Sequence, residues 1–170
     1  MQPRLGEAAR LCANKVTAGP EVDLEAMRAD SPVLVLLAAG KGTRFGKSPK
    51  CVQSINGRPL ARHTLAAFGE LSDSPSVCLV GYESDQVCAA LGDGNLFVHT
   101  DDPAGGTALA AMEAFCVQRL ESVNPIIVIS MGDRIVPVRI FDRLLATHRS
   151  DDEADLTILT AVYDSPKHQG

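Results

Sequence analysis

The sequence contains no tryptophan, and aromatic residues make up only 4% of its 170 residues. Proteins that bind single-stranded nucleic acid stack bases on several aromatic rings, so this class is disfavoured. The net charge of −5 offers no general attraction to nucleic acid or to an anionic membrane surface. The longest apolar run, residues 33–39, is too short to cross a bilayer. We therefore expect neither a nucleic-acid nor a membrane partner, and a cytoplasmic location because no signal-peptide pattern opens the chain.

Closely spaced metal ligands are also missing. Five cysteines occur without any Cys-x-x-Cys pair, and four histidines are scattered along the chain. Cys78 and Cys116 lie inside apolar segments, which favours small buried side chains in a reducing compartment. We predict no zinc site.

Residues 1–31 differ from the rest in being rich in Ala, Leu, Glu and Arg. This composition predicts helix, a break at Gly19–Pro20, and helix again over 21–29, without a strand. We interpret residues 1–31 as a helical N-terminal extension, which is a candidate cap or contact for homo-oligomerisation.

From Pro32 onward, short apolar runs rich in β-branched residues alternate with helical stretches. The runs fall at 33–38, 76–80, 95–99, 125–130 and 156–163, and the helical stretches at about 59–70, 84–91, 106–121 and 137–148. Runs that are apolar on both faces are typical of parallel strands covered by helices on two sides. Residues 32–170 are therefore predicted to form an α/β domain. We expect a Rossmann-like, doubly wound, mainly parallel sheet in three layers. Ligands of such sheets bind beyond the carboxyl ends of the strands, which selects the loops 39–50, 81–85, 100–106 and 131–136.

The loop after the first of these strands is rich in glycine and positive charge. No Asp or Glu occurs between Asp30 and Glu70. Six cations lie in that interval: Lys41, Arg44, Lys47, Lys50, Arg58 and Arg62. Glycines let backbone N–H groups approach an anion, and cations beside them suit a polyphosphate.

Two common phosphate-binding motifs do not fit this loop. A P-loop requires glycine where Lys41 stands, and a Rossmann fingerprint requires glycine where Phe45 stands. The acidic residue that binds ribose about 20 residues after a Rossmann loop is also missing.

Residues 37–45, Leu-Ala-Ala-Gly-Lys-Gly-Thr-Arg-Phe, followed by Pro49-Lys50, resemble the signature L-A-A-G-x-G-T-R-[MF]-…-P-K. This is the signature of the sugar-1-phosphate nucleotidyltransferases, and residues 55–60 resemble the turn that follows it in that family. The resemblance implies that Arg44 acts on a triphosphate and that Lys50 stabilises charge during transfer. It also implies a set of nucleotide-binding residues: Leu37, Ala38, Ala39, Gly40, Lys41, Gly42 and Thr43.

A second segment of the resemblance begins the helix expected at 106–121. Gly106 and Thr107 are similar to the end of the segment Q-x-x-x-x-G-T-[GA], which contacts uracil in the UDP-N-acetylglucosamine pyrophosphorylase branch. On sequence alone, Thr107 also fits an N-cap of that helix. The glutamine of the segment is absent, because its place falls at about Asp101 or Ala104. A uridine preference therefore does not follow.

Asp133 follows the apolar run 125–130, where a carboxylate can reach a cation bound to a ligand. The family has G-D-x-P-L-[IV] there, with the Asp as a Mg²⁺ ligand, which implies the same role for Asp133. Mg²⁺ takes one or two protein carboxylates together with phosphate oxygens. This chain departs from the pattern after the aspartate, where it reads Arg134-Ile135-Val136-Pro137.

The resemblance implies a nucleotidyltransferase that binds a nucleoside triphosphate with Mg²⁺. It would transfer the nucleoside monophosphate to a sugar-1-phosphate or similar phosphorylated acceptor and release pyrophosphate. One alternative is a MobA-like or cytidylyltransferase relative with a non-sugar acceptor, and another is a non-catalytic nucleotide-binding or regulatory domain. Because residues 32–170 match only the front part of the family's catalytic domain, we expect the chain to bind the nucleotide but to transfer poorly alone.

Overall fold

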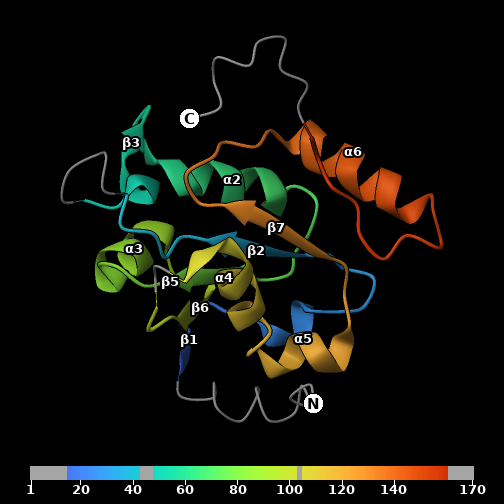
Figure 1. The fold of residues 1–170 in the computed structure, drawn as a ribbon, viewed down its shortest axis with the longest axis horizontal. Coiled ribbons are helices and arrows are strands. Elements are labelled where there is room, and N and C mark those ends of the chain that lie inside the picture. The colour runs from blue at the N-terminus through green and yellow to red at the C-terminus, as the bar shows by residue number, and fades with distance from the viewer. Residues whose placement is uncertain (1–14, 43–47, 103–104, 161–170) are drawn as a thin grey trace.

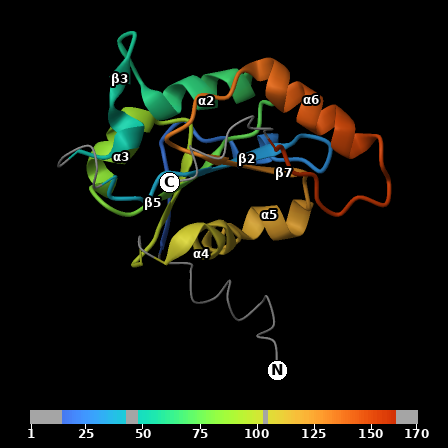
Figure 2. The ribbon, with the colours of Figure 1, turned by 45° about the horizontal axis from the view of Figure 1, so that its top comes forward.

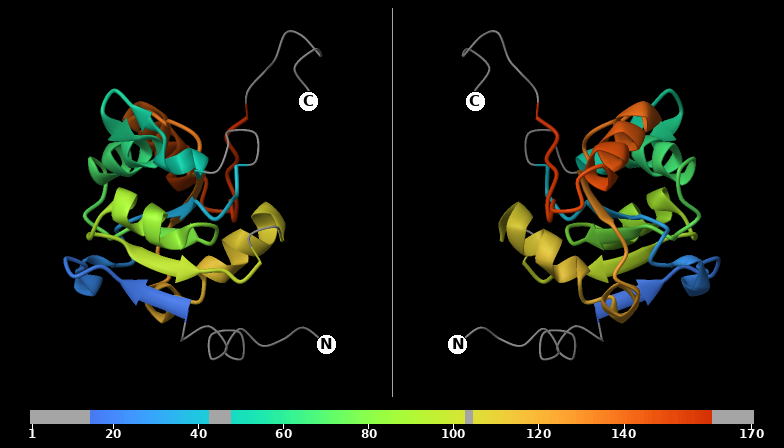
Figure 3. Two further views of the ribbon diagram at one scale, coloured as in Figure 1. Left: turned by 90° about the vertical axis from the view of Figure 1, so that its left-hand side faces the viewer. Right: turned by 90° about the vertical axis from the view of Figure 1, so that its right-hand side faces the viewer.

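The computed structural model describes residues 15–42, 48–102 and 105–160. A five-stranded sheet with the order β1-β6-β5-β2-β7 forms its centre (Figure 1). The strands are β1 (Val16–Ala18), β2 (Val33–Leu37), β5 (Val77–Val80), β6 (Leu96–His99) and β7 (Ile127–Met131). All neighbouring pairs are parallel except β1, which runs antiparallel to β6 as the outermost strand (Figure 3).

Helices cover both faces of this sheet (Figure 2). One face carries α2 (Leu60–Gly69), α3 (Ser84–Leu91) and α6 (Val138–Arg149), and the other carries α4 (Gly106–Ala114) and α5 (Gln118–Val123). Short elements complete the described chain: the 3-10 turns η2 (Leu24–Ala26) and η4 (Lys50–Val52), and the two-stranded ribbon of β3 (Ser54–Ile55) and β4 (Arg58–Pro59). The predicted three-layer, mainly parallel α/β fold is confirmed.

The core lies on both sides of β2, whose five residues are all buried. Val33, Val35 and Leu37 pack with β5, β6 and the helices α4 and α5. Leu34 and Leu36 point to the opposite face, where α2, α3 and α6 cover them. The alternation of side chains along a strand explains why an uninterrupted apolar run is needed here. It also makes β2 the rigid centre from which the loop after it extends.

Phe68 of α2 is the largest fully buried side chain, and its ring meets that of Phe141 on α6 edge to face at 5.3 Å. We expect Phe68→Ala to lower the free energy of unfolding by about 3–5 kcal/mol, since it leaves a cavity between two helices. Leu109→Ala, at a side chain that is 40% exposed, is the matched control and should change it by less than about 1 kcal/mol. Urea denaturation of both variants measures the difference. Equal losses would contradict this assignment of the core.

The N-terminal region differs from its predicted helical structure within residues 15–31. Val16–Ala18 form a strand on the edge of the main sheet, and residues 21–29 contain only the short turn η2. The helical prediction is wrong here because Val16 and Thr17 favour the extended backbone that the free edge of β6 pairs with. Residues 1–14 lie outside the described residues, and the domain boundary at residue 31 stays a prediction.

Two further expectations also need correction. The single helix over 106–121 is divided into α4 and α5, because Val117 is extended and buries its side chain in the core. The strand expected over 156–163 is absent from its described part, 156–160. Leu156, Ile158 and Leu159 are 74%, 69% and 61% exposed there, so no neighbouring strand covers them.

Among the cysteines, Cys78 is fully buried as expected, and burial raises the pKa of its thiol. Cys116 is buried too, as expected, but it is disulfide-bonded, which the expectation of a reducing compartment did not include. Within the described residues, no helix is both long and apolar enough to cross a membrane.

Candidate functional site

The strand order reverses at β2, which has β5 on one side and β7 on the other. In open α/β sheets, ligands bind at such a switch point, beyond the carboxyl ends of the parallel strands. The loops that follow β2, β5 and β7 meet there through backbone hydrogen bonds. The Gly132 N–H donates to the Leu37 carbonyl at 2.8 Å, and the Tyr82 N–H donates to the Ala39 carbonyl at 3.1 Å. The glycine-rich loop is therefore held between its two neighbours.

Gly132 permits a close approach between the loops after β2 and β7. A Cβ atom at this position would lie 3.0 Å from the Leu37 carbonyl oxygen and 3.1 Å from the Ala38 Cβ. Any side chain would therefore push the two loops apart. The next residue, Asp133, gains its position beside the glycine-rich loop from this contact.

Lys50 and Asp133 face each other across the switch point. The Lys50 Nζ lies 3.6 Å from an oxygen of Asp133, and the two side chains are 30% and 31% exposed. Gly42 packs against the stem of Lys50, because a Cβ atom there would lie 3.0 Å from the Lys50 Cγ. Gly42 also has a φ of +58°, which favours glycine. Two residues predicted separately, 83 positions apart, thus share one half-buried site.

Asp133 has a second cationic neighbour in Arg134, whose Nε lies 3.8 Å from its other carboxylate oxygen. Arg134 is 75% exposed, so this contact is strongly screened by water. The loop itself is fixed by Thr64 of α2, which is fully buried. The Thr64 hydroxyl donates to the Arg134 carbonyl at 2.6 Å and accepts from the Val136 N–H at 3.3 Å. Sequence reasoning missed Thr64, because nothing in a helix pattern marks which polar residue supports a distant loop.

Tyr82 is a second residue that the motifs did not reveal. The Lys41 ammonium lies 5.9 Å from the centre of its ring, within the range of a cation–π contact. Tyr82 follows β5, in one of the four loops that the topology rule selects. The only signal for it was therefore its position at the carboxyl end of a strand.

Cys51 lies directly beside Lys50 in η4 but is not suited to act as a nucleophile. Its side chain is 4% exposed, and burial raises the pKa of its thiol to about 11. A thiol with this pKa stays protonated at neutral pH. Cys51 is therefore not a candidate nucleophile of this site.

The other predicted residues fall into three groups. The side chains of Leu37, Ala38 and Ala39 are buried, so they present only backbone to a ligand, whereas Gly40 and Lys41 are exposed at the mouth of the loop. Gly106 and Thr107 begin α4 two strands away, beyond β6, and both are exposed. Gly105 is the N-cap of α4 and no side chain caps the helix, so Thr107 is not the cap expected from the sequence. Thr43 and Arg44 lie outside the described residues.

Comparison with protein families identifies the family of this chain. The MobA-like NTP transferase domain family matches residues 34–168. The chain belongs to this family. The recognition of a nucleotidyltransferase relative is confirmed.

Curated relatives of this MobA-like domain include bifunctional proteins named GlmU. That of Streptomyces griseus subsp. griseus is 34% identical over 143 residues, which is 82% of this chain and 30% of the relative. That of Geobacillus sp. (strain WCH70) is 31% identical over 137 residues, which is 80% of this chain and 29% of the relative. The chain therefore spans about a third or less of the length of these relatives.

Solved structures show the same fold. The homologue of Rv0371c from Mycobacterium sp. strain JC1 is 27% identical with a TM-score of 0.57, covering 72% of this chain and 61% of its own. A nucleotidyl transferase from Methanothermobacter, Mth528, is 20% identical with a TM-score of 0.55, over 68% of this chain and 57% of its own. At that identity the likeness speaks for the fold alone.

The residues at the switch point fit a divalent cation that would be bound together with phosphate oxygens. Within the described chain, no group of three His, Cys, Asp or Glu side chains could hold a metal ion. Asp133 supplies one half-exposed carboxylate at the switch point. Mg²⁺ is commonly held by one or two carboxylates plus substrate phosphates, and this donor set suits that arrangement.

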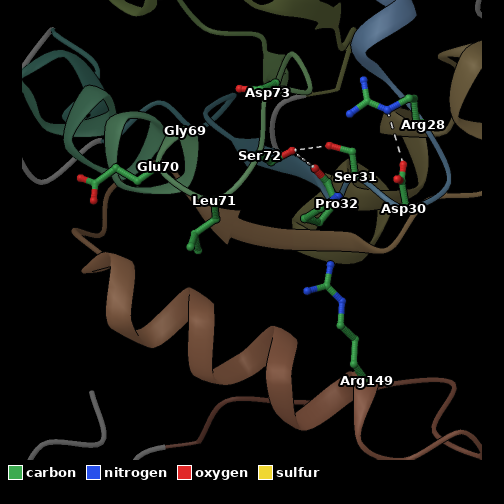
Figure 4. Close-up of a pocket in the computed structure, with 10 residues that line it drawn as sticks. All are labelled: Arg28, Asp30, Ser31, Pro32, Gly69, Glu70, Leu71, Ser72, Asp73 and Arg149. Carbon is green, nitrogen blue, oxygen red and sulfur yellow. Dashed lines mark hydrogen bonds and ion pairs between the residues drawn. The ribbon is translucent and has the colours of Figure 1, made fainter.

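A cavity of about 300 Å³ lies at the opposite, amino end of β2 (Figure 4). The hydroxyls of Ser31, Ser72 and Ser74 hydrogen-bond to one another and to backbone carbonyls there. The charges around the cavity are mixed, with two arginines and three acids among its lining residues. This balance does not select an anion, so the carboxyl edge remains the candidate site of this domain.

Proposed function

We propose that this domain is a nucleotidyltransferase that binds a nucleoside triphosphate with Mg²⁺. It transfers the nucleoside monophosphate to a phosphorylated small molecule and releases pyrophosphate. The observation that carries the proposal is the pairing of Lys50 with Asp133 across the switch point, beside a glycine-rich loop. A cation and a metal-binding carboxylate a few ångströms apart are what a Mg²⁺-triphosphate needs.

Each group of the site has a role in this proposal. A phosphate oxygen of the acceptor attacks the α-phosphorus of the nucleotide, and the bond from that phosphorus to the bridging oxygen of the β-phosphate breaks. Lys50 and Arg44 offset negative charge on the phosphates, and Asp133 holds the cation that accompanies them. The loop from Leu37 to Thr43 positions the nucleotide. Mg²⁺ supplies Lewis-acid polarisation of the phosphate oxygens when bound.

The base of the nucleotide would lie toward the loop after β6, where Gly106 and Thr107 begin α4. From β7 to β6 there are three strand spacings, about 14 Å, which suits an extended nucleotide. At the near end of this loop stands Asp101, 86% exposed, with one oxygen 2.6 Å from the Lys15 Nζ. An ionised carboxylate only accepts hydrogen bonds. Guanine offers it two adjacent N–H donors, whereas uracil offers one N–H between two carbonyl oxygens.

We therefore expect the nucleotide preference to depend on Asp101. GTP, and to a lesser degree CTP through its amino group, should bind better than UTP. Asp101→Gln should narrow the GTP-to-UTP affinity ratio by about tenfold, the effect of one charged hydrogen bond. Calorimetric titration with each nucleotide in Mg²⁺ measures the ratio. Asp102→Gln is the neighbouring control, and an equal change in both variants would exclude a specific role for Asp101.

The acceptor is the least defined part of the proposal. The resemblance of residues 37–50 to the sugar-1-phosphate nucleotidyltransferases supports a sugar phosphate, and the alternative of a MobA-like or cytidylyltransferase relative supports a non-sugar acceptor. Pyrophosphate release from each nucleotide with a panel of sugar-1-phosphates, alditol phosphates and phosphocholine separates these classes. We also propose a cytoplasmic location for this protein and no nucleic-acid or membrane partner. Self-association through residues 1–31 is part of the same proposal.

A second candidate, a nucleotide-binding domain without catalysis, has one observation in its favour. Both oxygens of Asp133 face a cationic side chain, Lys50 on one and Arg134 on the other. Nucleotide binding without pyrophosphate release for any acceptor would support this candidate.

A manganese complex is known for the structural neighbour Rv0371c of Mycobacterium tuberculosis. Comparing Mn²⁺ with Mg²⁺ in the same assay therefore tests the choice of metal.

A further inference from the structure

Thr64 of α2 carries a hydroxyl group that does not serve its own helix. The side chain is fully buried, and a buried hydroxyl is costly unless it forms hydrogen bonds. A threonine within a helix commonly donates to the carbonyl four residues earlier, as Thr147 of α6 does to Arg143 at 2.9 Å. The Thr64 hydroxyl instead donates to the Arg134 carbonyl at 2.6 Å, 70 positions away in the sequence. It therefore supports a distant part of the chain.

The two hydrogen bonds of Thr64 fix the second half of the loop between β7 and α6. The Arg134 carbonyl accepts from the hydroxyl, and the Val136 N–H donates to it at 3.3 Å. The first half of the loop is fixed from the other side, where the Gly132 N–H donates to the last carbonyl of β2 at 2.8 Å. Asp133 lies between these two anchors. The position of its carboxylate therefore depends on both of them.

The helix α2 also holds the segment that carries Lys50. The Leu60 N–H at the start of α2 donates to the Gln53 carbonyl at 2.8 Å, and the Gln53 N–H donates to the Lys50 carbonyl at 3.1 Å. Further along the helix, the Phe68 ring meets the Phe141 ring of α6 edge to face. One helix thus connects the segments that carry the two partners of the ion pair at the switch point.

We propose that Thr64 is a positioning residue for the divalent cation, because its hydroxyl holds the loop that presents the Asp133 carboxylate. This inference rests on the proposed function, in which Asp133 binds that cation. Thr64 itself is fully buried and acts only through the loop. Removing a residue that orients a metal ligand commonly lowers metal affinity by about 10- to 100-fold.

Thr64→Val and Thr64→Ser separate the hydroxyl from the shape of the side chain. Valine has nearly the volume of threonine but no hydrogen-bonding group, whereas serine retains the hydroxyl. Thr64→Val should raise the Mg²⁺ concentration needed for half-maximal nucleotide binding, the Mg²⁺ midpoint, by about tenfold. Thr64→Ser should keep the midpoint within about threefold of the wild type. Calorimetric titrations at a series of Mg²⁺ concentrations measure it, and an unchanged midpoint in Thr64→Val would overturn the proposal.

Ser72→Ala is the matched control for the loss of a supporting hydroxyl. The Ser72 hydroxyl donates to the Pro32 carbonyl at 2.6 Å and accepts from the Ser74 N–H at 3.2 Å. This is the same pattern of contacts at the opposite, amino end of β2. Ser72→Ala should lower the unfolding temperature but leave the Mg²⁺ midpoint unchanged. An equal rise of the midpoint in Ser72→Ala and Thr64→Val would trace the effect to stability and contradict the role in positioning.

A double variant shows whether Thr64 acts through Asp133. When Asp133→Asn is already present, Thr64→Val should raise the Mg²⁺ midpoint by less than about twofold, because the ligand that it positions is lost. A further rise as large as that in the wild-type background would mean that the two residues act independently, and the proposal would be wrong.

Hydrogen exchange of the Val136 amide tests the anchor without metal or nucleotide. Thr64→Val should speed this exchange about tenfold or more, since the amide loses its acceptor, whereas Ser72→Ala should not change it. An unchanged exchange rate in Thr64→Val would show that the hydroxyl does not hold the loop. Failure of the proposed function gives a different result: the wild-type chain would bind no nucleotide with Mg²⁺, whatever the exchange rates, and the inference would fall with it.

Discussion

Lys50→Ala should lower the rate of pyrophosphate release by about 100- to 1000-fold, the loss seen when a group that stabilises transition-state charge is removed. The wild-type Lys50 ammonium lies 3.6 Å from Asp133 in a half-buried position, where its charge is less screened than on the surface. The fall is expected mainly in kcat, since charge develops on the leaving pyrophosphate. Steady-state kinetics with the preferred nucleotide and acceptor provides the measurement.

Arg139→Ala is the matched control for this substitution. Arg139 is an exposed cation on α6, so its removal changes the net charge equally without altering the switch point. The rate of pyrophosphate release by the Arg139→Ala variant should stay within about twofold of the wild type, because exposed charges act weakly through water. If Lys50→Ala and Arg139→Ala have the same rate, Lys50 has no role in transfer.

Asp133→Asn should raise the Mg²⁺ concentration needed for half-maximal nucleotide binding by about tenfold or more, since a neutral amide is a poorer ligand for this cation than a carboxylate. The variant preserves the shape of the side chain but removes its charge. Stability should change little, because Asp133 and its partner Lys50 are each about 30% exposed and such pairs contribute about 1 kcal/mol or less. Nucleotide titrations at a series of Mg²⁺ concentrations give the midpoint.

Asp142→Asn on α6 serves as the control for the loss of one negative charge, and its Mg²⁺ midpoint should equal that of the wild type. An unchanged Mg²⁺ midpoint in the Asp133→Asn variant would show that Asp133 does not bind the metal ion. A general loss of folding would instead appear as a lowered unfolding temperature in both the presence and the absence of Mg²⁺.

The central fold could be predicted because its strands carry their own signal. The apolar run at 33–38 must be buried on both faces, and all five residues of β2 are indeed buried. The edges could not be predicted in the same way. Val16–Ala18 pair because β6 offers a free edge, which a local pattern does not contain. The run at 156–160 has strand-like residues, but it finds no strand partner among the described residues.

In the candidate site too, some residues could be predicted from the sequence and others could not. The glycine and the charges of residues 40–50, and Asp133 after a strand, were visible as motifs. Their proximity followed from the rule that parallel strands end at one edge, and the contact between Lys50 and Asp133 agrees with it. The supporting contacts of Thr64 and Tyr82 depend on how α2 and the loop after β5 pack. Such contacts are tertiary, so no spacing of residues in the sequence predicts them.

The central claim is that the switch point between β2 and β7 binds a nucleoside triphosphate with a divalent cation. Calorimetric titration of the 170-residue chain with ATP, CTP, GTP and UTP, with and without Mg²⁺, measures this directly. We predict that at least one nucleotide binds with Mg²⁺, and that Lys50→Ala and Asp133→Asn each weaken its binding about tenfold or more. Absence of binding by all four nucleotides, or binding that neither substitution alters, would contradict the account.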